Sequence, residues 1–358
     1  MNQHLWTEHF SAHPRMEPTD AVKLAFQSAF GCGHLLADRA HVAAYAAREG
    51  ALVPENPAAP LYEAIGGGLC RLNLACPEVR RLSGERIADL MFLTADAVGA
   101  GNKAAFENSL LQLQALAHQG RTPFTADALE SYLADYRRRG CPVVSHSEGY
   151  RAAYAPAYRV VKTALAQLAP LLGEADDRLA QDGRALIVVD GPCAAGKTTL
   201  AACLGQLYHT QPLSLDDFFL PPHMRTADRL SQPGGNVHYE RFLAEVLRPL
   251  AAGEFFSFHR FSCRTGQMEE QPHIPAPVTV IEGSYSHHPA FDQLYQSLHA
   301  IRLWLDVGEE EQLCRLQSRN PEMLQMFRTR WIPLEKTYRE AYHIREKADL
   351  RLKLEGLP

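Results

Sequence analysis

Residues 185–199 read Ala-Leu-Ile-Val-Val-Asp-Gly-Pro-Cys-Ala-Ala-Gly-Lys-Thr-Thr, and this stretch decides the fold of the second half of the chain. The apolar run Leu186–Val189 is typical of a buried strand, and Lys197–Thr199 begin a helical pattern. The loop between them, Gly191–Gly196, has the spacing G-x-x-x-x-G-K-[ST] in a strand–loop–helix order. Its small residues let backbone N–H groups converge on phosphate oxygens, and the helix N-terminus adds partial positive charge. The stretch therefore predicts a nucleoside triphosphate site.

The residues of this loop have predicted roles in holding the triphosphate. Lys197 is expected to reach the β- and γ-phosphates, and the Thr198 hydroxyl is expected to hold Mg²⁺. The predicted nucleotide-binding residues are Gly191, Cys193, Ala194, Ala195, Gly196, Lys197, Thr198 and Thr199. A plain glycine turn between a strand and a helix is the alternative, but chance rarely produces the full spacing.

Length, composition and charge narrow the class of protein. The 358 residues are enough for two domains, and 46% apolar with 22% charged residues is ordinary for a globular protein. A formal net charge of −5 gives no electrostatic reason to expect nucleic acid or an anionic membrane as partner. No signal peptide and no apolar run of roughly 18 residues is visible. Eight cysteines without C-x-x-C pairs indicate reduced thiols, so we expect a cytoplasmic protein, with an oligomer possible.

The two halves of the chain have different patterns. The first half shows helical spacing and few strand signals, with helices expected at 20–30, 85–98, 103–117, 125–140, 148–155 and 158–172. The polar stretch Gly173–Gly183 is expected to be the boundary. In the second half, strands expected at 186–189, 212–215, 278–281 and 301–305 alternate with helices expected at 197–207, 239–250, 309–319 and 333–344. We therefore predict an α/β P-loop NTPase-type domain, residues 179–358, with helices on both faces of a parallel sheet, preceded by an all-α domain, residues 1–178.

Carboxylates follow two of the predicted strands. Asp216 and Asp217 end the first of them, and Glu282 ends the strand Val278–Ile281. Because ligands of such sheets lie at the carboxyl ends of strands, these groups are expected beside the phosphate loop. Phosphorylation of an alcohol needs one carboxylate to accept the hydroxyl proton and others to hold Mg²⁺. The predicted metal site is therefore Thr198, Glu282 and Asp216; helix or turn capping is the alternative for each carboxylate.

Four arginines, Arg315, Arg319, Arg328 and Arg330, follow the predicted strand at residues 301–305. Arginines on a helical flap could close over a triphosphate and neutralise the group in transfer, whereas solvated helix faces are the commoner origin of such charges. Arg330 is favoured because it precedes Trp331-Ile332-Pro333, which should hold it in place.

Together these segments resemble the uridine kinase/phosphoribulokinase family of P-loop kinases, over residues of about 184–352. The resemblance rests on Gly191–Thr198, Asp216-Asp217-Phe218-Phe219, Ile281-Glu282-Gly283 and the arginine-bearing flap. It implies phosphoryl transfer from ATP, with Mg²⁺, to a hydroxyl of a small-molecule phosphoacceptor. By motif match Asp216 takes the position of the catalytic base and Glu282 that of the acidic residue after the second strand. Lys197 and Arg330 would stabilise the transferred group.

The segments that recognise the acceptor depart from that family. The family's Asp-His-Pro turn is replaced by Asn236-Val237-His238-Tyr239, and its Tyr-Asp-Phe block by His259–Arg264. Added arginines suggest a more anionic or differently shaped acceptor than uridine. The candidate acceptor contacts are Asp217, Arg225, Arg229, His238, Arg260 and Arg264.

The first half gives no function of its own. Gly66-Gly67-Gly68 favours a flexible turn, and Ser145 with Glu148 has the spacing of a capping box, from which His146 could project to touch a phosphate. A second class of function therefore stays open: a nucleotide-dependent switch that signals through the helical half without a metabolite acceptor. A kinase of nucleic-acid ends is disfavoured by the acidic balance of charge.

Overall fold

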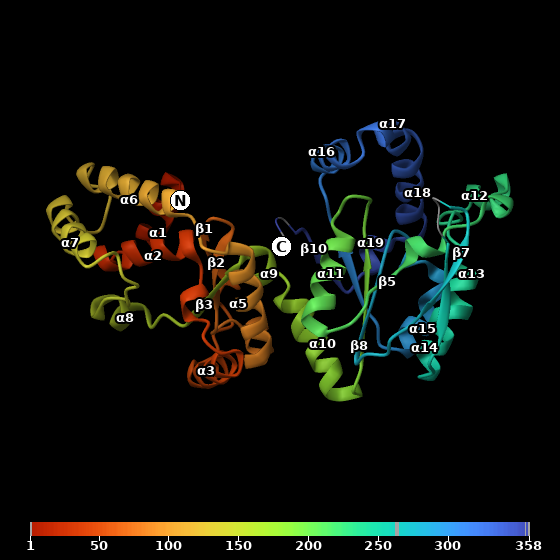
Figure 1. The fold of residues 1–358 in the computed structure, drawn as a ribbon, viewed down its shortest axis with the longest axis horizontal. Coiled ribbons are helices and arrows are strands. Elements are labelled where there is room, and N and C mark those ends of the chain that lie inside the picture. The colour runs from red at the N-terminus through yellow and green to blue at the C-terminus, as the bar shows by residue number, and fades with distance from the viewer. Residues whose placement is uncertain (1, 262–264, 355, 357–358) are drawn as a thin grey trace. The chain divides into compact units, whose positions relative to one another are not determined.

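The computed structural model describes residues 2–261, 265–354 and 356, and the chain forms two compact units that divide between Pro170 and Leu171 (Figure 1). The stretch Gly173–Gly183, expected as the boundary, is largely helical, because α10 (Ala169–Asp182) runs through it. Leu171, Leu172 and Ala175 are buried at helical spacing. The polar residues that suggested a boundary are the solvent-facing side of an amphipathic helix.

The N-terminal unit is mainly helical but not all-helical. Its described residues include the strands β1 (Tyr62–Gly66), β2 (Leu69–Asn73) and β3 (Tyr158–Lys162), which form an antiparallel sheet in that order. The expectation of an all-α domain is therefore wrong, as is the helix expected to begin at Tyr158. The glycine turn joins β1 to β2, and a Cβ on Gly67 would lie 2.4 Å from the carbonyl oxygen of Ser28. Only glycine fits this close approach at its positive φ of 65°.

Most of the helices expected in this unit are confirmed. The helices are α1 (Gln3–Ala12), α2 (Pro18–Phe30), α3 (Arg39–Leu52), α4 (Pro77–Arg80), α5 (Gly84–Val98), α6 (Lys103–His118), α7 (Ala126–Arg138), α8 (Glu148–Tyr154) and α9 (Thr163–Ala166), with a 3-10 turn η1 (Gly33–Leu35). Thr125 caps α7 as expected, accepting from the backbone N–H of Ala128. The cap of α8 is Ser147, whose Oγ accepts from the Tyr150 N–H, so the capping box expected at Ser145 is wrong.

The C-terminal unit is built on a parallel sheet. Its described strands are β4 (Ala185–Asp190), β5 (Leu213–Ser214), β8 (Val278–Glu282), β9 (Ile301–Leu305) and β10 (Leu350–Leu352), in the order β10-β9-β4-β8-β5. Every residue of the central strand β4 is buried, as expected for a strand covered on both faces. The parallel sheet predicted from the alternating pattern is confirmed. The edge strand β10 and the antiparallel hairpin β6 (Ser257–Phe261) and β7 (Met268–Pro272) were not predicted.

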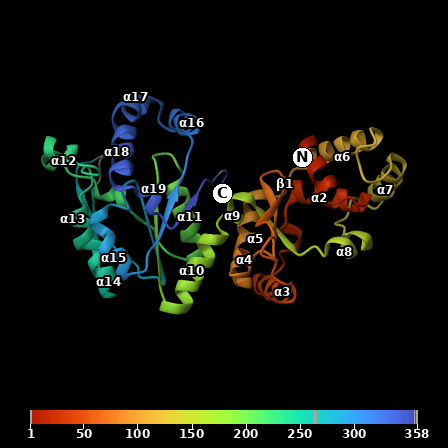
Figure 2. The same cartoon turned by 180° about the vertical axis from the view of Figure 1, so that it is seen from behind.

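Helices cover both faces of this sheet (Figures 1 and 2). The described helices of the C-terminal unit are α10, α11 (Lys197–Tyr208), α12 (Ala227–Ser231), α13 (Tyr239–Phe242), α14 (Arg248–Ala252), α15 (Asp292–Ser297), α16 (Glu309–Arg319), α17 (Leu324–Met326), α18 (Ile332–Tyr342) and α19 (Ile344–Lys347). Shorter turns are the 3-10 segments η2 (Leu215–Phe218), η3 (Pro222–Met224), η5 (Pro289–Phe291) and η6 (Pro321–Met323) and the π-helical segments η4 (Leu243–Leu247) and η7 (Phe327–Trp331). One face packs on α11, and the other on an aromatic core that includes Phe242, Phe291 and Tyr295.

Within the described ranges, no helix is both long and apolar enough to cross a membrane.

Candidate nucleotide and phosphoacceptor site

The glycine-rich loop leaves the carboxyl end of the central strand β4 and leads into α11. At its start Gly191 crosses close to the neighbouring strand, where an added Cβ would lie 2.6 Å from the carbonyl oxygen of Leu305. Further along, Ala194 has a φ of 60°, in the left-handed region. The backbone thus curls tightly in front of the helix N-terminus, the arrangement that presents N–H groups to an anion.

A buried carboxylate that the sequence analysis missed anchors this loop. Asp190 is only 1% exposed and accepts hydrogen bonds from the backbone N–H of Gly191 (2.7 Å) and of His287 (2.9 Å). Its Oδ2 also accepts from the Tyr338 hydroxyl of α18 at 2.9 Å. Asp190 therefore joins the strand, the loop and a distant helix, and it makes the geometry of the loop rigid.

The side chain of Lys197 folds back onto the glycine-rich loop. Its Nζ donates to the carbonyl oxygens of Gly191 (2.8 Å) and Pro192 (3.0 Å) and to Ser284 Oγ (3.1 Å). The side chain is buried, so the ammonium group is held where the loop would receive phosphate oxygens. Contact with a bound triphosphate would exchange these neutral acceptors for anionic phosphate oxygens, which form stronger hydrogen bonds with an ammonium group.

Oxygen donors suited to Mg²⁺ lie beside the lysine. Glu282, at the end of β8, accepts from Ser214 Oγ at 2.9 Å and from Thr198 Oγ1 at 3.4 Å. Burial raises the pKa of this carboxyl, and the negative charge of Asp216 adds to the rise. Magnesium prefers carboxylate, hydroxyl and water oxygens, so Thr198, Glu282 and Asp216 fit the ion chemically.

The adjacent residues Asp216 and Asp217 have different surroundings. Asp216 lines the pocket in front of the loop, and its carboxylate forms no hydrogen bond or ion pair with any described residue. Although the residue is exposed toward the pocket, the pocket walls withdraw it from bulk water and raise its pKa, an effect that Lys197 and Arg319 reduce. Asp217 instead pairs with Arg260, whose Nε lies 2.9 Å from its Oδ1.

Lys197, Thr198, Asp216 and Glu282 line one pocket of about 1290 Å³ within the C-terminal unit. Its lining includes the loop from Cys193 to Thr199, Asp216, Phe219, Arg225, Leu230, Asn236, Glu282, Ser284, Tyr285 and residues of α16, η7 and α18. Small-molecule sites usually occupy about 300–1,000 Å³, so the space is sufficient for a nucleotide and a second ligand.

The predicted flap contributes three of its four arginines to this pocket. Arg315, Arg319 and Arg330 line it, whereas Arg328 is not among the described residues that do so. Arg315 donates to the carbonyl oxygen of Ala194 at 3.0 Å and so ties α16 to the loop. Arg330 comes from the π-helical turn η7, a widened turn of the kind often found at functional sites. Helices α16, α17 and α18 follow one another at one end of the unit, with the short α17 between the other two (Figures 1 and 2).

Glu335 on α18 is a second site residue that the sequence analysis missed. Its Oε2 accepts from the backbone N–H of Cys193 at 2.9 Å, and its Oε1 accepts from Ser284 Oγ at the same distance. Burial raises the pKa of this carboxyl, partly offset by Lys197. A carboxyl oxygen of α18 thus accepts a hydrogen bond from a backbone N–H of the phosphate loop.

Among the predicted acceptor contacts, the structure brings Arg225 to the pocket, where its Nε donates to the Leu220 carbonyl at 2.7 Å. The other described candidates, Asp217, Arg229, His238 and Arg260, are not among the lining residues. Arg229 donates to Gly235 O, Val237 O, Tyr239 OH and both Glu240 oxygens. His238 caps α13, accepting from Arg241 N–H at 3.3 Å. Arg264 falls outside the described residues.

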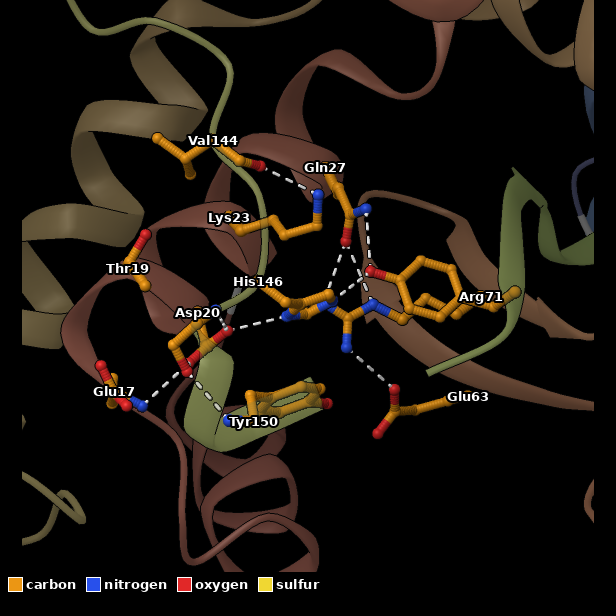
Figure 3. Close-up of polar contacts among 12 residues, drawn as sticks. Glu17, Thr19, Asp20, Lys23, Gln27, Glu63, Arg71, Val144, His146 and Tyr150 are labelled. Atoms are coloured by element: carbon orange, nitrogen blue, oxygen red, sulfur yellow. Dashed lines mark hydrogen bonds and ion pairs between the residues drawn. The ribbon is translucent and has the colours of Figure 1, made fainter. Parts of the chain in front are cut away.

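The histidine considered in the first half lies in a different environment from the one expected. His146 is 8% exposed, and its Nδ1 lies 2.8 Å from Asp20 Oδ1 while its Nε2 lies 2.6 Å from the Tyr158 hydroxyl. Figure 3 shows it above the ring of Tyr150, surrounded by other polar side chains of this unit. The interior hydrogen bonds occupy both ring nitrogens, so the suggestion that His146 projects toward a phosphate is wrong.

No protein-family model matches the chain, and no curated protein matches it. Solved structures similar to it include one described as a possible uridine kinase from Bacillus stearothermophilus, with 17% identity, a TM-score of 0.37, and coverage of 51% of this chain and 99% of that one. Another is described as a fructose transport system kinase from Silicibacter sp. TM1040, with 20% identity, a TM-score of 0.34, and coverage of 47% of this chain and 89% of that one.

Proposed function

We propose that the C-terminal unit is an ATP- and Mg²⁺-dependent kinase that transfers the γ-phosphoryl group to a hydroxyl of a small metabolite. The carrying observation is the Asp216 carboxylate, which shares a pocket with the phosphate loop and has no partner among the described residues. A carboxylate with a structural task is normally paired, as Asp217 is with Arg260. An unpaired one with a raised pKa, beside a triphosphate site, fits a general base.

The remaining residues would each supply one part of phosphoryl transfer. The backbone of the loop and Lys197 would hold the β- and γ-phosphates, and Lys197 with Arg330 would stabilise charge on the transferred group. Thr198 and Glu282 would hold Mg²⁺, which supplies further neutralisation of the phosphates when bound. Asp216 would orient the acceptor hydroxyl and accept its proton.

A nucleoside or a sugar is the acceptor class that we favour, because the pocket offers both hydrogen-bonding and apolar surface. Asn236 and Arg225 provide polar groups, while Phe219 and Tyr285 provide flat apolar walls. The positive charge of Arg225 and Arg319 would also accommodate an acceptor that already carries a phosphate.

The test is ADP release by the full-length chain over a panel of nucleosides, sugars and sugar phosphates, with a 5′-hydroxyl oligonucleotide as a separate arm. We expect ATP consumption to require one class of small acceptor. The variant Lys197→Ala should abolish this consumption. Consumption that is equal with and without every acceptor would refute the kinase and favour the nucleotide switch. Consumption stimulated only by the oligonucleotide would refute the small-molecule acceptor.

A further inference from the structure

Three potential metal ligands converge in the N-terminal unit, separately from the nucleotide pocket. His9 lies in the last turn of α1, His13 is the residue that caps the C-terminus of this helix, and Glu63 lies on β1. One donor atom from each lies within 4.8 Å of the other two. The backbone N–H of His13 still donates to the carbonyl oxygen of His9, and the two rings stack on the same side of the chain. Zinc sites on helices use the same spacing of four residues.

The hydrogen bonds of His9 set the roles of its two ring nitrogens. Its Nε2 lies 2.8 Å from the carbonyl oxygen of Ala64, which can only accept, so the proton is on Nε2. Nδ1 then carries a lone pair when the ring is neutral. It is buried, has no hydrogen-bond partner among the described residues, and lies 3.1 Å from Glu63 Oε1. The buried lone pair of Nδ1 and the neighbouring carboxylate oxygen repel each other unless a proton or a metal cation lies between them.

The separations fit a shared ion. Zinc bonds to nitrogen and oxygen of about 2.0–2.2 Å, in tetrahedral geometry, place neighbouring ligand atoms roughly 3.3–3.6 Å apart. His9 Nδ1 and His13 Nδ1 lie 3.1 Å and 3.6 Å from the same oxygen of Glu63. His13 Nδ1 also lies 3.2 Å from the carbonyl oxygen of His9, a hydrogen bond that would be exchanged for the metal bond.

Residues around the three side chains hold the imidazole of His9 and the carboxylate of Glu63 in fixed orientations. Metal-binding histidines usually donate their other ring N–H to a carbonyl or carboxylate, and His9 donates to Ala64 O. The second oxygen of Glu63 accepts from Arg71 Nη1 at 3.2 Å, as Figure 3 shows. Arg71 is in turn fixed by two hydrogen bonds to Gln27 Oε1. Glu63 Oε1 is thereby left to face the two imidazoles.

We propose that His9, His13 and Glu63 bind a divalent transition-metal ion of the zinc class. Two imidazole nitrogens favour zinc over magnesium or calcium, which take oxygen ligands. Three protein ligands leave a fourth position for water or a small ligand, and Glu63 and His13 remain partly exposed. A proton shared by His9 and Glu63 is the competing explanation, but it gives His13 no part in the cluster.

The experiment is a zinc titration of the chelator-treated full-length chain against a fluorescent zinc chelator, with excess Mg²⁺ present to occupy the site beside the phosphate loop. We expect one equivalent of zinc, and a loss of affinity of about 100-fold or more in Glu63→Gln and in His13→Asn. His4→Ala is the matched control, because His4 lies on the same helix in an exposed pair with Glu8. Co²⁺ should give the visible absorption of a four-coordinate site in the wild type and lose it in both variants.

The partly exposed positions of Glu63 and His13 keep the variants foldable, and far-UV circular dichroism checks this. Absence of zinc binding in the wild type, or an unchanged affinity in both folded variants, would overturn the proposal in favour of the shared proton. Zinc binding that is lost in Glu282→Gln and retained in Glu63→Gln would overturn it by placing the ion at the phosphate loop.

Discussion

Replacing Asp216 by Asn tests the proposed base with little change to the pocket. The side chain keeps its size and polarity but cannot accept a proton. Because the carboxylate forms no hydrogen bond or ion pair with described residues, the change removes no structural contact. A positioned general base contributes about 10²–10⁴-fold in rate. At about 1.36 kcal/mol per factor of ten, the barrier should rise by about 2.7–5.4 kcal/mol.

The assay measures initial rates with saturating ATP and acceptor, together with ATP binding by calorimetry. We expect kcat to fall as stated while the ATP dissociation constant is unchanged or lower, since a negative charge near the triphosphate is lost. Asp217→Asn is the matched control: it breaks only the ion pair with the exposed Arg260, worth about 0–1 kcal/mol, and should leave kcat within a few-fold.

The pH dependence gives a second readout of the same group. Desolvation raises the pKa of Asp216, so the base is protonated, and the rate falls, at a higher pH than for an ordinary aspartate. The acidic limb of kcat should therefore lie above the usual carboxyl range and vanish from the residual activity of Asp216→Asn. A kcat of Asp216→Asn within a few-fold of the wild type, with ATP bound, would refute the assignment.

Four substitutions separate the roles of loop, flap and scaffold. Gly191→Ala should destabilise the fold by about 1–3 kcal/mol in urea unfolding, since its Cβ would meet Leu305 O at 2.6 Å; an unchanged midpoint would contradict this. Lys197→Ala should abolish the rise in melting temperature that ATP causes, and an undiminished rise would show that the loop does not hold the phosphates. Arg330→Ala should lower kcat by about 10²–10³-fold without loss of stability. Arg229→Ala should instead lower the stability and leave kcat unchanged, because Arg229 holds the surrounding backbone through hydrogen bonds and does not line the pocket.

The parts of the site that follow from local sequence could be predicted. The phosphate loop is formed within a dozen residues, and strand ends bring Asp216 and Glu282 to the same edge of a parallel sheet. Glu335 could not be found this way, because tertiary packing brings it to Cys193 from 142 positions along the chain. Asp190 had a local signal, a carboxylate between the strand and the first glycine, that the analysis passed over.

The sheet of the N-terminal unit was missed for a physical reason. Its strands are five residues long and contain buried arginines, Arg71 on β2 and Arg159 on β3, which interrupt the apolar alternation expected of a strand. Arg71 is buried because Gln27 and Glu63 satisfy its guanidinium group. Such pairing is invisible until the tertiary structure is known.

The destination of the γ-phosphoryl group tests the central claim most directly. The reaction is run in ¹⁸O-labelled water with ATP and the best acceptor of the panel, and the products are separated by mass spectrometry. The proposed kinase transfers the group to the acceptor hydroxyl, so we predict an unlabelled phosphate ester formed in equal amount to ADP. Inorganic phosphate carrying ¹⁸O, formed in equal amount to ADP without any ester, would contradict the account and make the C-terminal unit a nucleotide hydrolase.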